Sequence, residues 1–162
     1  MKNKNIVKDI LIESAKFRIN KYDSATGKFL DSSEIDGNTL LNEGINELTK
    51  LIGSDSGSEW SNANAYLGVG DSGAAASASQ TGLLGTSVYK GMESGYPTYG
   101  SSQKITWKSS FASDEANQDW KEFTVGNDST DAAAVNLNRA TSDEGTKTAG
   151  QTWELELEIT FS

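Results

Sequence analysis

The sequence predicts an all-β protein, built as an antiparallel β-sandwich or jelly-roll-like domain with one amphipathic helix. Three observations support this fold class. The last segment alternates strictly between apolar and polar residues. Short β-type segments recur about every ten residues between turns rich in glycine, serine and asparagine. Only one stretch, at about residues 39–52, has the apolar spacing of a helix.

The final segment is the clearest strand in the chain. Trp153, Leu155, Leu157, Ile159 and Phe161 all fall on one face, with glutamates and a threonine between them. This pattern is typical of a half-buried antiparallel strand with one wet face. We expect so regular a strand to lie at the centre of its sheet.

The predicted helix follows from a different spacing. Leu41, Ile45, Leu48 and Ile52 recur at the helical interval, and Leu51 widens the apolar stripe. Two flanking residues suggest its ends, with Asn38 as the N-cap and Gly53 as a left-handed C-cap. The opposite face would carry the polar residues Asn42, Asn46, Glu47 and Lys50. Such a helix is expected to pack on the core.

The remaining elements divide the chain into two parts, an amino-terminal arm and hairpin over residues 1–37 and a sandwich domain over residues 38–162 that packs with it as one compact unit. The arm begins with about fifteen residues that form either a short helix or a segment that packs only on a partner. A hairpin follows, with its turn at Asp23–Gly27. Further strands are expected near residues 66–70, 88–92, 105–111, 123–125 and 135–137, with polar loops at 53–64 and 71–80.

The composition excludes several kinds of chemistry. The chain has no histidine and no cysteine, which removes Ser-His-Asp and Cys-His catalysis and the usual zinc and iron sites. The net charge of −9 disfavours nucleic acid as a partner. No apolar run reaches the ~20 residues of a membrane span, and no signal peptide follows the basic start. We therefore predict no catalytic, cofactor-binding or metal-binding residue, and a protein made in a cytoplasm that leaves it by a route such as lysis.

The acidic residues offer the main remaining chemistry. Asp114 and Glu115 are neighbours, as are Asp143 and Glu144, and neighbouring side chains on an extended chain point in opposite directions. Surface acid explains them better than a two-carboxylate site of the glycosidase type. The loops at 55–59 and 127–131 lack the EF-hand spacing, so polar loops are favoured and a structural cation stays open. The glycine-rich stretch 67–73 lacks the ending of a phosphate-binding loop.

Some of the aromatic residues are expected in the core and four others are candidate contact sites. Trp107 and Trp153 are in phase with apolar strand faces and are expected in the core. Trp60 and Trp120 lie beside polar residues and, with Tyr96 and Tyr99, are candidates to contact a partner or a carbohydrate. The alternative for the two tryptophans is an aromatic lid over the end of the sandwich.

Several blocks, in order, resemble a family of small virion proteins of tailed bacteriophages. The resemblance covers about residues 40–162 and consists of these stretches: 40–46, 62–72, 92–97, 105–111, 115–123, 137–139, 145–147 and the final alternating strand. The chain departs from the family at Thr124, where a glycine is usual, and before residue 38, where no counterpart is clear. The resemblance implies a component of the virion without enzymatic activity, labelled either as a capsid decoration (cement) protein or as a tail-fibre-like appendage.

Three functional hypotheses follow. The first is a capsid decoration protein, a homo-oligomer and specifically a trimer, which binds the major capsid protein through its amino-terminal arm and stabilises the head. The alternative is a tail fibre or baseplate appendage that binds host-surface carbohydrate through Trp60, Tyr96, Tyr99 and Trp120. The third is a glycan-degrading enzyme that uses Asp114 and Glu115. The sequence favours the first.

Overall fold

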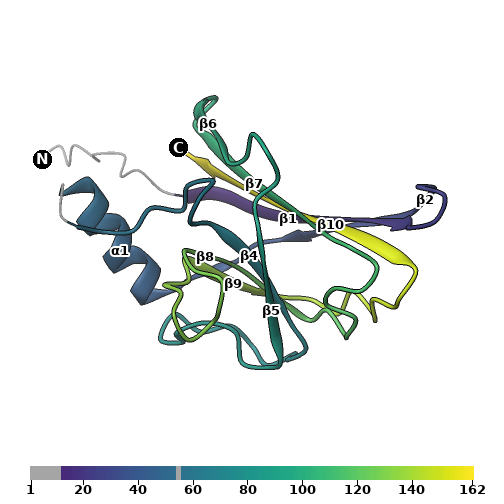
Figure 1. Ribbon diagram of the computed structural model, residues 1–162. Helices are drawn as coiled ribbons and strands as arrows, with labels where there is room; N and C mark the ends of the chain where they lie inside the picture. The colour runs from purple at the N-terminus through teal and green to yellow at the C-terminus, as the bar shows by residue number, and fades with distance from the viewer. Residues whose placement is uncertain (1–11, 54–55) are drawn as a thin grey trace, which may run out of the picture.

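Two five-stranded antiparallel sheets form a β-sandwich with one helix at its end (Figure 1). The computed structural model describes residues 12–53 and 56–162. Sheet A has the strand order β2-β1-β10-β7-β6, and sheet B has the order β3-β9-β8-β4-β5. The elements are β1 Ile12–Asp23, β2 Phe29–Asp36, β3 Thr39–Leu40, α1 Asn42–Ile52, β4 Tyr66–Gly70, β5 Ser87–Gly91, β6 Thr98–Ser101, β7 Lys104–Phe111, β8 Glu122–Gly126, β9 Asn138–Thr141 and β10 Gln151–Phe161. The predicted all-β sandwich is confirmed.

Strand β10 is the central strand of sheet A. It pairs with β1 on one side, where Leu157 lies opposite Phe17, and with β7 on the other, where Leu157 lies opposite Trp107. Its apolar side chains at 153, 155, 157 and 159 are buried in the sandwich, and its glutamates lie on the outer face. The alternating pattern therefore predicted both the strand and its central place.

The predicted hairpin is also present, as β1 and β2. Its turn is closed by backbone hydrogen bonds from the N–H of Asp23 to the oxygen of Lys28 and from the N–H of Gly27 to the oxygen of Asp23, and the Asp23 carboxylate accepts the backbone N–H of Thr26 at 2.8 Å. Gly27 has the positive φ of +67° that this turn requires. Because β1 lies between β2 and β10, the described residues of the amino-terminal part are built into sheet A. Residues 1–11 of the predicted arm lie outside the described residues.

Aromatic residues from both sheets make up much of the core. The ring of Trp120 is in edge contact with those of Phe111 and Trp153, with centroid distances of 4.9 Å to each. Phe123 of sheet B contacts both Trp120 and Phe17 of sheet A. These contacts join the two sheets at the centre of the sandwich.

The helix differs from the prediction at both ends. It begins at Asn42, because Thr39 and Leu40 pair with β9 as strand β3 and Leu41 is the N-cap residue, with an extended backbone. Asn38 is therefore not the cap. Gly53 follows the helix with φ −76°, so it does not adopt the predicted left-handed conformation.

The buried face of α1 is also rotated from the predicted one. Gly44 and Glu47 are buried, whereas Ile45 and Ile52 are 40% and 83% exposed. Gly44 explains the rotation, since a Cβ there would lie 2.5 Å from the Cα of Leu137. The helix packs its glycine directly on the backbone that precedes β9.

Two strands of the second half differ in extent from the prediction. Strand β9 begins at Asn138, because the residues before it run irregularly beside β8, with Gly126 and Asn136 as an isolated bridge. Strand β6 was not predicted. It is short and fully exposed, so it has no apolar alternation to reveal it.

Candidate functional site: an apolar groove at one end of the sandwich

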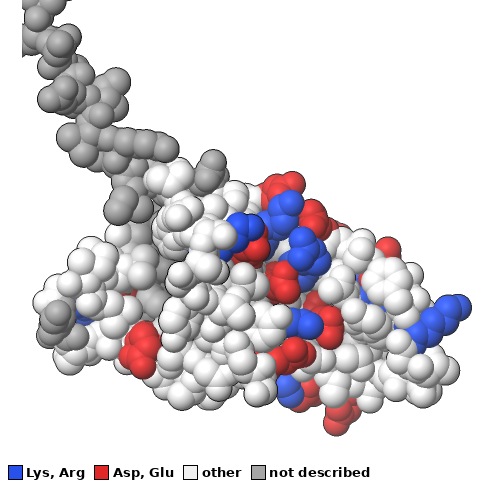
Figure 2. Space-filling view, turned by 90° about the horizontal axis from the view of Figure 1, so that it is seen from above, with Lys and Arg blue, Asp and Glu red and all other residues white. Residues whose placement is uncertain are grey.

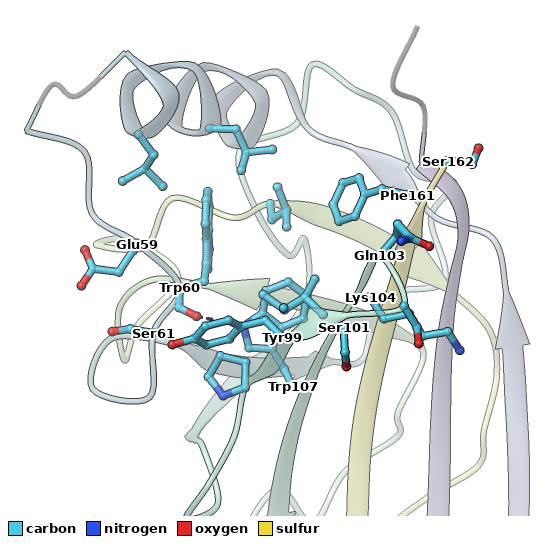
Figure 3. A pocket seen from close by; sticks show the side chains of 17 residues that line it. Glu59, Trp60, Ser61, Tyr99, Ser101, Gln103, Lys104, Trp107, Phe161 and Ser162 are labelled. Carbon is cyan, nitrogen blue, oxygen red and sulfur yellow. Dashed lines mark hydrogen bonds between the residues drawn. The ribbon is translucent and has the colours of Figure 1, made fainter. Parts of the chain in front are cut away.

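An open apolar groove of about 800 Å³ lies between α1 and the turn that joins β6 to β7 (Figure 3). Most of its surface comes from aromatic and aliphatic side chains at the end of the sandwich. It is lined by Leu48, Leu51, Glu59, Trp60, Ser61, Pro97, Tyr99–Ile105, Trp107, Leu137, Phe161 and Ser162.

Hydrogen bonds fix the floor of the groove. The backbone oxygen of Trp60 accepts the indole N–H of Trp107 at 3.0 Å, and the indole N–H of Trp60 reaches the backbone oxygen of Val135 at 3.3 Å. These bonds tie the loop before β4 to sheet A and to the segment before β9. The ring of Trp60 is therefore held between α1 and Tyr99, as Figure 3 shows, and this part of the groove surface is fixed by the protein itself.

Three exposed apolar side chains belong to elements that line the groove. Ile45 and Ile52 on α1 are 40% and 83% exposed, and Tyr99 on β6 is 74% exposed. We call the groove together with these three residues the docking end. In Figure 1, α1, β6 and the last residues of β10 lie at this end of the molecule, and the β1–β2 hairpin lies at the opposite end.

The outer face of sheet A is of a different kind. Figure 2 shows lysines and arginines alternating with acidic residues across it. Arg18 bridges Glu34 at 2.8 Å and Glu156 at 2.9 Å, and Lys108 lies 3.3 Å from Glu154. Cross-strand pairs of this kind make a well-solvated surface. This face is thus suited to solvent rather than to an apolar partner.

The loops over sheet B are held by a buried ion pair. Glu122 and Arg139 are both fully buried, and Nε of Arg139 donates to Glu122 at 2.9 Å, with Nη2 at 2.7 Å from the same oxygen. The carboxylate of Glu122 also accepts the backbone N–H groups of Leu84 at 2.9 Å and Gly85 at 2.7 Å. The pair therefore pins the loop between β4 and β5 on the sheet.

A second polar cluster, around Asp131, holds the acidic loop at 127–131 against sheet B. Asp131 accepts the backbone N–H of Leu83 at 3.0 Å and the hydroxyl of Tyr89 at 2.5 Å. Burial and the nearby carboxylate raise the pKa of Tyr89 well above its usual range. The described residues contain no group of three or more acidic side chains placed to hold a metal ion. Of the other acidic loop, Asp55 lies outside the described residues.

The neighbouring acids do not converge on a common point. Glu115 pairs with Lys90 at 2.5 Å and accepts the backbone N–H of Ala112, and the lysine lowers the pKa of its carboxyl. Asp143 accepts the backbone N–H of Gly145, and Glu144 accepts the hydroxyl of Ser142 at 2.7 Å. Glu144 also accepts the hydroxyl of Ser33 on β2. These acids are therefore engaged in separate structural contacts.

Lys147 is a buried cation of the same loop region. Its ammonium group donates to the backbone oxygen of Ala112 at 2.7 Å and to the side-chain oxygen of Asn117 at 3.0 Å. Burial lowers the pKa of Lys147. These bonds tie the loop after β7 to the loop before β10.

The structure separates the four candidate contact residues. Trp60 and Tyr99 line the groove together, and Tyr96 is partly buried just before Pro97 on its wall. Trp120 is a correction to the sequence analysis. It is fully buried, its indole N–H donates to the backbone oxygen of Ala116, and it presents no surface to a partner. Its ring packs on Phe111, Phe123 and Trp153 instead.

Sequence reasoning missed most of the groove. Many of its apolar walls come from α1, from β7 and from the end of β10, at residues Leu48, Leu51, Ile105 and Phe161. Each of these residues matched an apolar stripe and was assigned to the core. Phe161, at the end of the alternating strand, gave the one available signal, because a strand that stays apolar to its last residue needs a cover there.

Comparison of the chain with protein-family models, with curated proteins and with solved structures gives no match. Among the described residues, no helix has the length and apolar character needed to cross a membrane.

Proposed function

We propose that this chain is a non-enzymatic structural protein of a tailed-bacteriophage particle, and that it decorates the outside of the head. One observation carries the proposal: apolar side chains gather at the docking end, while the broad face of sheet A is covered by paired charges. A small domain with one apolar end and a well-solvated face is suited to sit on a larger assembly.

The proposed partners are the major capsid protein and other copies of this chain. The docking end faces the capsid, with Ile52 and Tyr99 as its most exposed apolar contacts, and the charged face of sheet A points outward. We propose a trimer as the oligomer, since closed symmetry lets one small domain bridge several capsid subunits. The protein is then a virion component made in the host cytoplasm.

The absence of catalysis is part of this proposal. Glu115 and Glu144 are engaged in separate contacts with Lys90 and Ser33, and the buried Glu122 holds backbone N–H groups and a guanidinium. Their carboxylates are used for stability. A glycan-degrading activity would need two of them at one cleft.

The test is the copy number of the protein in purified particles, measured by quantitative mass spectrometry against the major capsid protein. We expect a simple fraction of the number of capsid subunits. A few copies per hundred capsid subunits would move the protein to the tail and contradict the decoration role. Absence from the particle would contradict any virion role.

A tail appendage that binds carbohydrate is the second candidate, and the exposed ring of Tyr99 beside Trp60 favours it. In that case, host polysaccharide would cause a saturable change in tryptophan fluorescence, and Tyr99→Ala would abolish it. No change up to millimolar sugar would reject this alternative.

A further inference from the structure

A buried lysine meets an asparagine carboxamide where the loop after β7 lies beside the loop before β10. Nζ of Lys147 donates to Oδ1 of Asn117 at 3.0 Å. The carbon Cγ of Asn117 is bonded to that oxygen at about 1.2 Å, so it lies no more than about 4.2 Å from Nζ. A primary amine and a carboxamide are therefore held close to the distance at which they can react with each other.

Backbone and side-chain hydrogen bonds fix both groups in this arrangement. The backbone N–H of Lys147 donates to the backbone oxygen of Gln118 at 2.9 Å, so the lysine is held beside the neighbour of Asn117. The carboxamide is oriented as well, because Nδ2 of Asn117 donates to the backbone oxygen of Ser113 at 2.9 Å. Two reactants that the fold already holds in place lose little further entropy when they react.

The surroundings of Lys147 favour its neutral, nucleophilic form. The side chain is fully buried, and Nζ also donates to the backbone oxygen of Ala112 at 2.7 Å. Burial lowers the pKa of Lys147, while the charges of Glu115 and Asp114 act in the opposite direction. A desolvated amine is a better nucleophile than an exposed one, and Glu115 supplies a carboxylate that can carry a proton.

We propose that Lys147 and Asn117 join in an intramolecular isopeptide bond. Lys147 first releases its extra proton to solvent, and the neutral amine attacks Cγ of Asn117. The Nζ–Cγ bond forms and the Cγ–Nδ2 bond breaks. One proton passes from Nζ to Nδ2 by way of the Glu115 carboxylate, and ammonia leaves. The reaction exchanges one amide nitrogen for another, so it needs no oxidant or reductant.

The bond links two strands that are already paired at the centre of sheet A. Strand β7 ends at Phe111, which lies opposite Trp153 near the start of β10. A covalent link between the adjoining loops restricts the unfolded chain as a disulfide does. The chain has no cysteine with which to make a disulfide. The bond forms once in each chain, and its formation does not depend on the proposed role in a phage particle.

Mass spectrometry of the purified full chain tests this proposal. We expect a mass lower by one ammonia than the sequence requires. Tryptic digestion should give peptide 109–121 joined to peptide 140–162, which stays uncut at Lys147. Lys147→Arg and Asn117→Ala should both have their full mass, and Asn117 is exposed, so its alanine variant is expected to fold. The matched control, Lys121→Arg in the same stretch of chain, should still lose ammonia.

Three outcomes would overturn the proposal. A chain of full mass that trypsin cleaves after Lys147 contains no such bond. Loss of ammonia together with cleavage after Lys147 would mean that an asparagine has cyclised instead. A link between two chains would contradict a bond within one chain. The proton carrier has its own test: Glu115→Gln should leave most chains unlinked, and complete linkage in that variant would exclude Glu115 from the reaction.

Discussion

Glu122 and Arg139 form an ion pair that is completely buried between the loops and strands of sheet B. Both are fully buried, and together they hold backbone N–H groups of the loop between β4 and β5. A buried ion pair adds little net stability over an apolar pair, but removal of one partner leaves the other charge buried and uncompensated.

Glu122→Gln should therefore lower the free energy of unfolding by about 3–5 kcal/mol. The expected reason is the unpaired guanidinium of Arg139, which is fully buried. Urea unfolding followed by tryptophan fluorescence measures the change. Addition of Arg139→Met to Glu122→Gln should recover part of the loss.

The matched control is Glu34→Gln on the outer face of sheet A. Glu34 binds Lys16 and Arg18, but all three side chains are substantially exposed to water. Its loss should be much smaller than that of Glu122, because exposed pairs are screened and hydrated. Equal effects of the two substitutions would show that burial of the pair has no special importance.

At the scale of the element, α1 depends on one glycine. A Cβ at Gly44 would lie 2.5 Å from the Cα of Leu137 and 2.6 Å from its backbone oxygen, and neither backbone atom can give way easily. Gly44→Ala should destabilise the protein by about 1–3 kcal/mol, even though alanine is the better helix former. Thermal unfolding of the variant measures this.

Asn46→Ala is the control on the same helix. Asn46 is exposed, so the substitution should act through helix propensity alone and raise stability slightly. If Gly44→Ala were also stabilising, the close packing of α1 on the segment before β9 would be contradicted.

The same helix shows which parts of the fold a sequence can predict. The apolar residues of α1 correctly indicated its existence and approximate length. Its orientation depended on Gly44, which carries no hydropathy signal, and on Glu47, which is buried because it accepts the backbone N–H of Ser58 at 2.6 Å. That partner lies in a loop whose position is set by tertiary packing, so no local pattern reveals it.

Strand β10 is the feature that the sequence predicted best, and the groove is the feature that it predicted least. The alternation in β10 is a property of one segment, and it predicted the strand, its buried face and its central place. The groove is a property of several segments that meet in space, from α1, the loop at Trp60, the β6–β7 turn and the end of β10. Of its lining, the sequence indicated Trp60 and Tyr99 as contact candidates, whereas Trp120, which resembled them in sequence, is core.

At the scale of the whole molecule, the charge pairs predict the response to acid. The carboxyl groups of Asp23, Glu34, Glu115 and Asp119 have pKa values below their usual ones, through hydrogen bonds and ion pairs. A group with a lowered pKa in the folded state contributes stability above its unfolded pKa, and this is lost as the pH falls through the folded value. Glu43, whose pKa is raised by burial, acts in the opposite sense and offsets part of the loss.

The midpoint of thermal unfolding should therefore fall as the pH decreases from about 5 towards 3. The relevant ordinary pKa values are 3.8 for aspartate and 4.5 for glutamate. Glu34→Gln should make this decline shallower, because it removes one of the groups that titrate. A midpoint that stays constant or rises over this range would contradict the assignment of these pairs as stabilising.

The polarity of the molecule gives the last prediction, which concerns binding to the particle. Ile52 is 83% exposed and Tyr99 is 74% exposed at the docking end, so Ile52→Asn with Tyr99→Ser removes apolar contact area without opening the core. At an interface, loss of such contacts is expected to weaken binding at least tenfold, since one or two buried anchors carry much of the free energy of binding.

The matched control is Phe29→Ser with Leu30→Asn, whose side chains are 52% and 46% exposed in the hairpin at the opposite end. Binding of each variant to particles that lack the protein can be measured by co-sedimentation, with urea unfolding as a check that both fold normally. Loss of binding by the first pair alone would support the docking end, whereas loss by the hairpin pair alone would place the contact at the other end of the sandwich and overturn the proposed orientation.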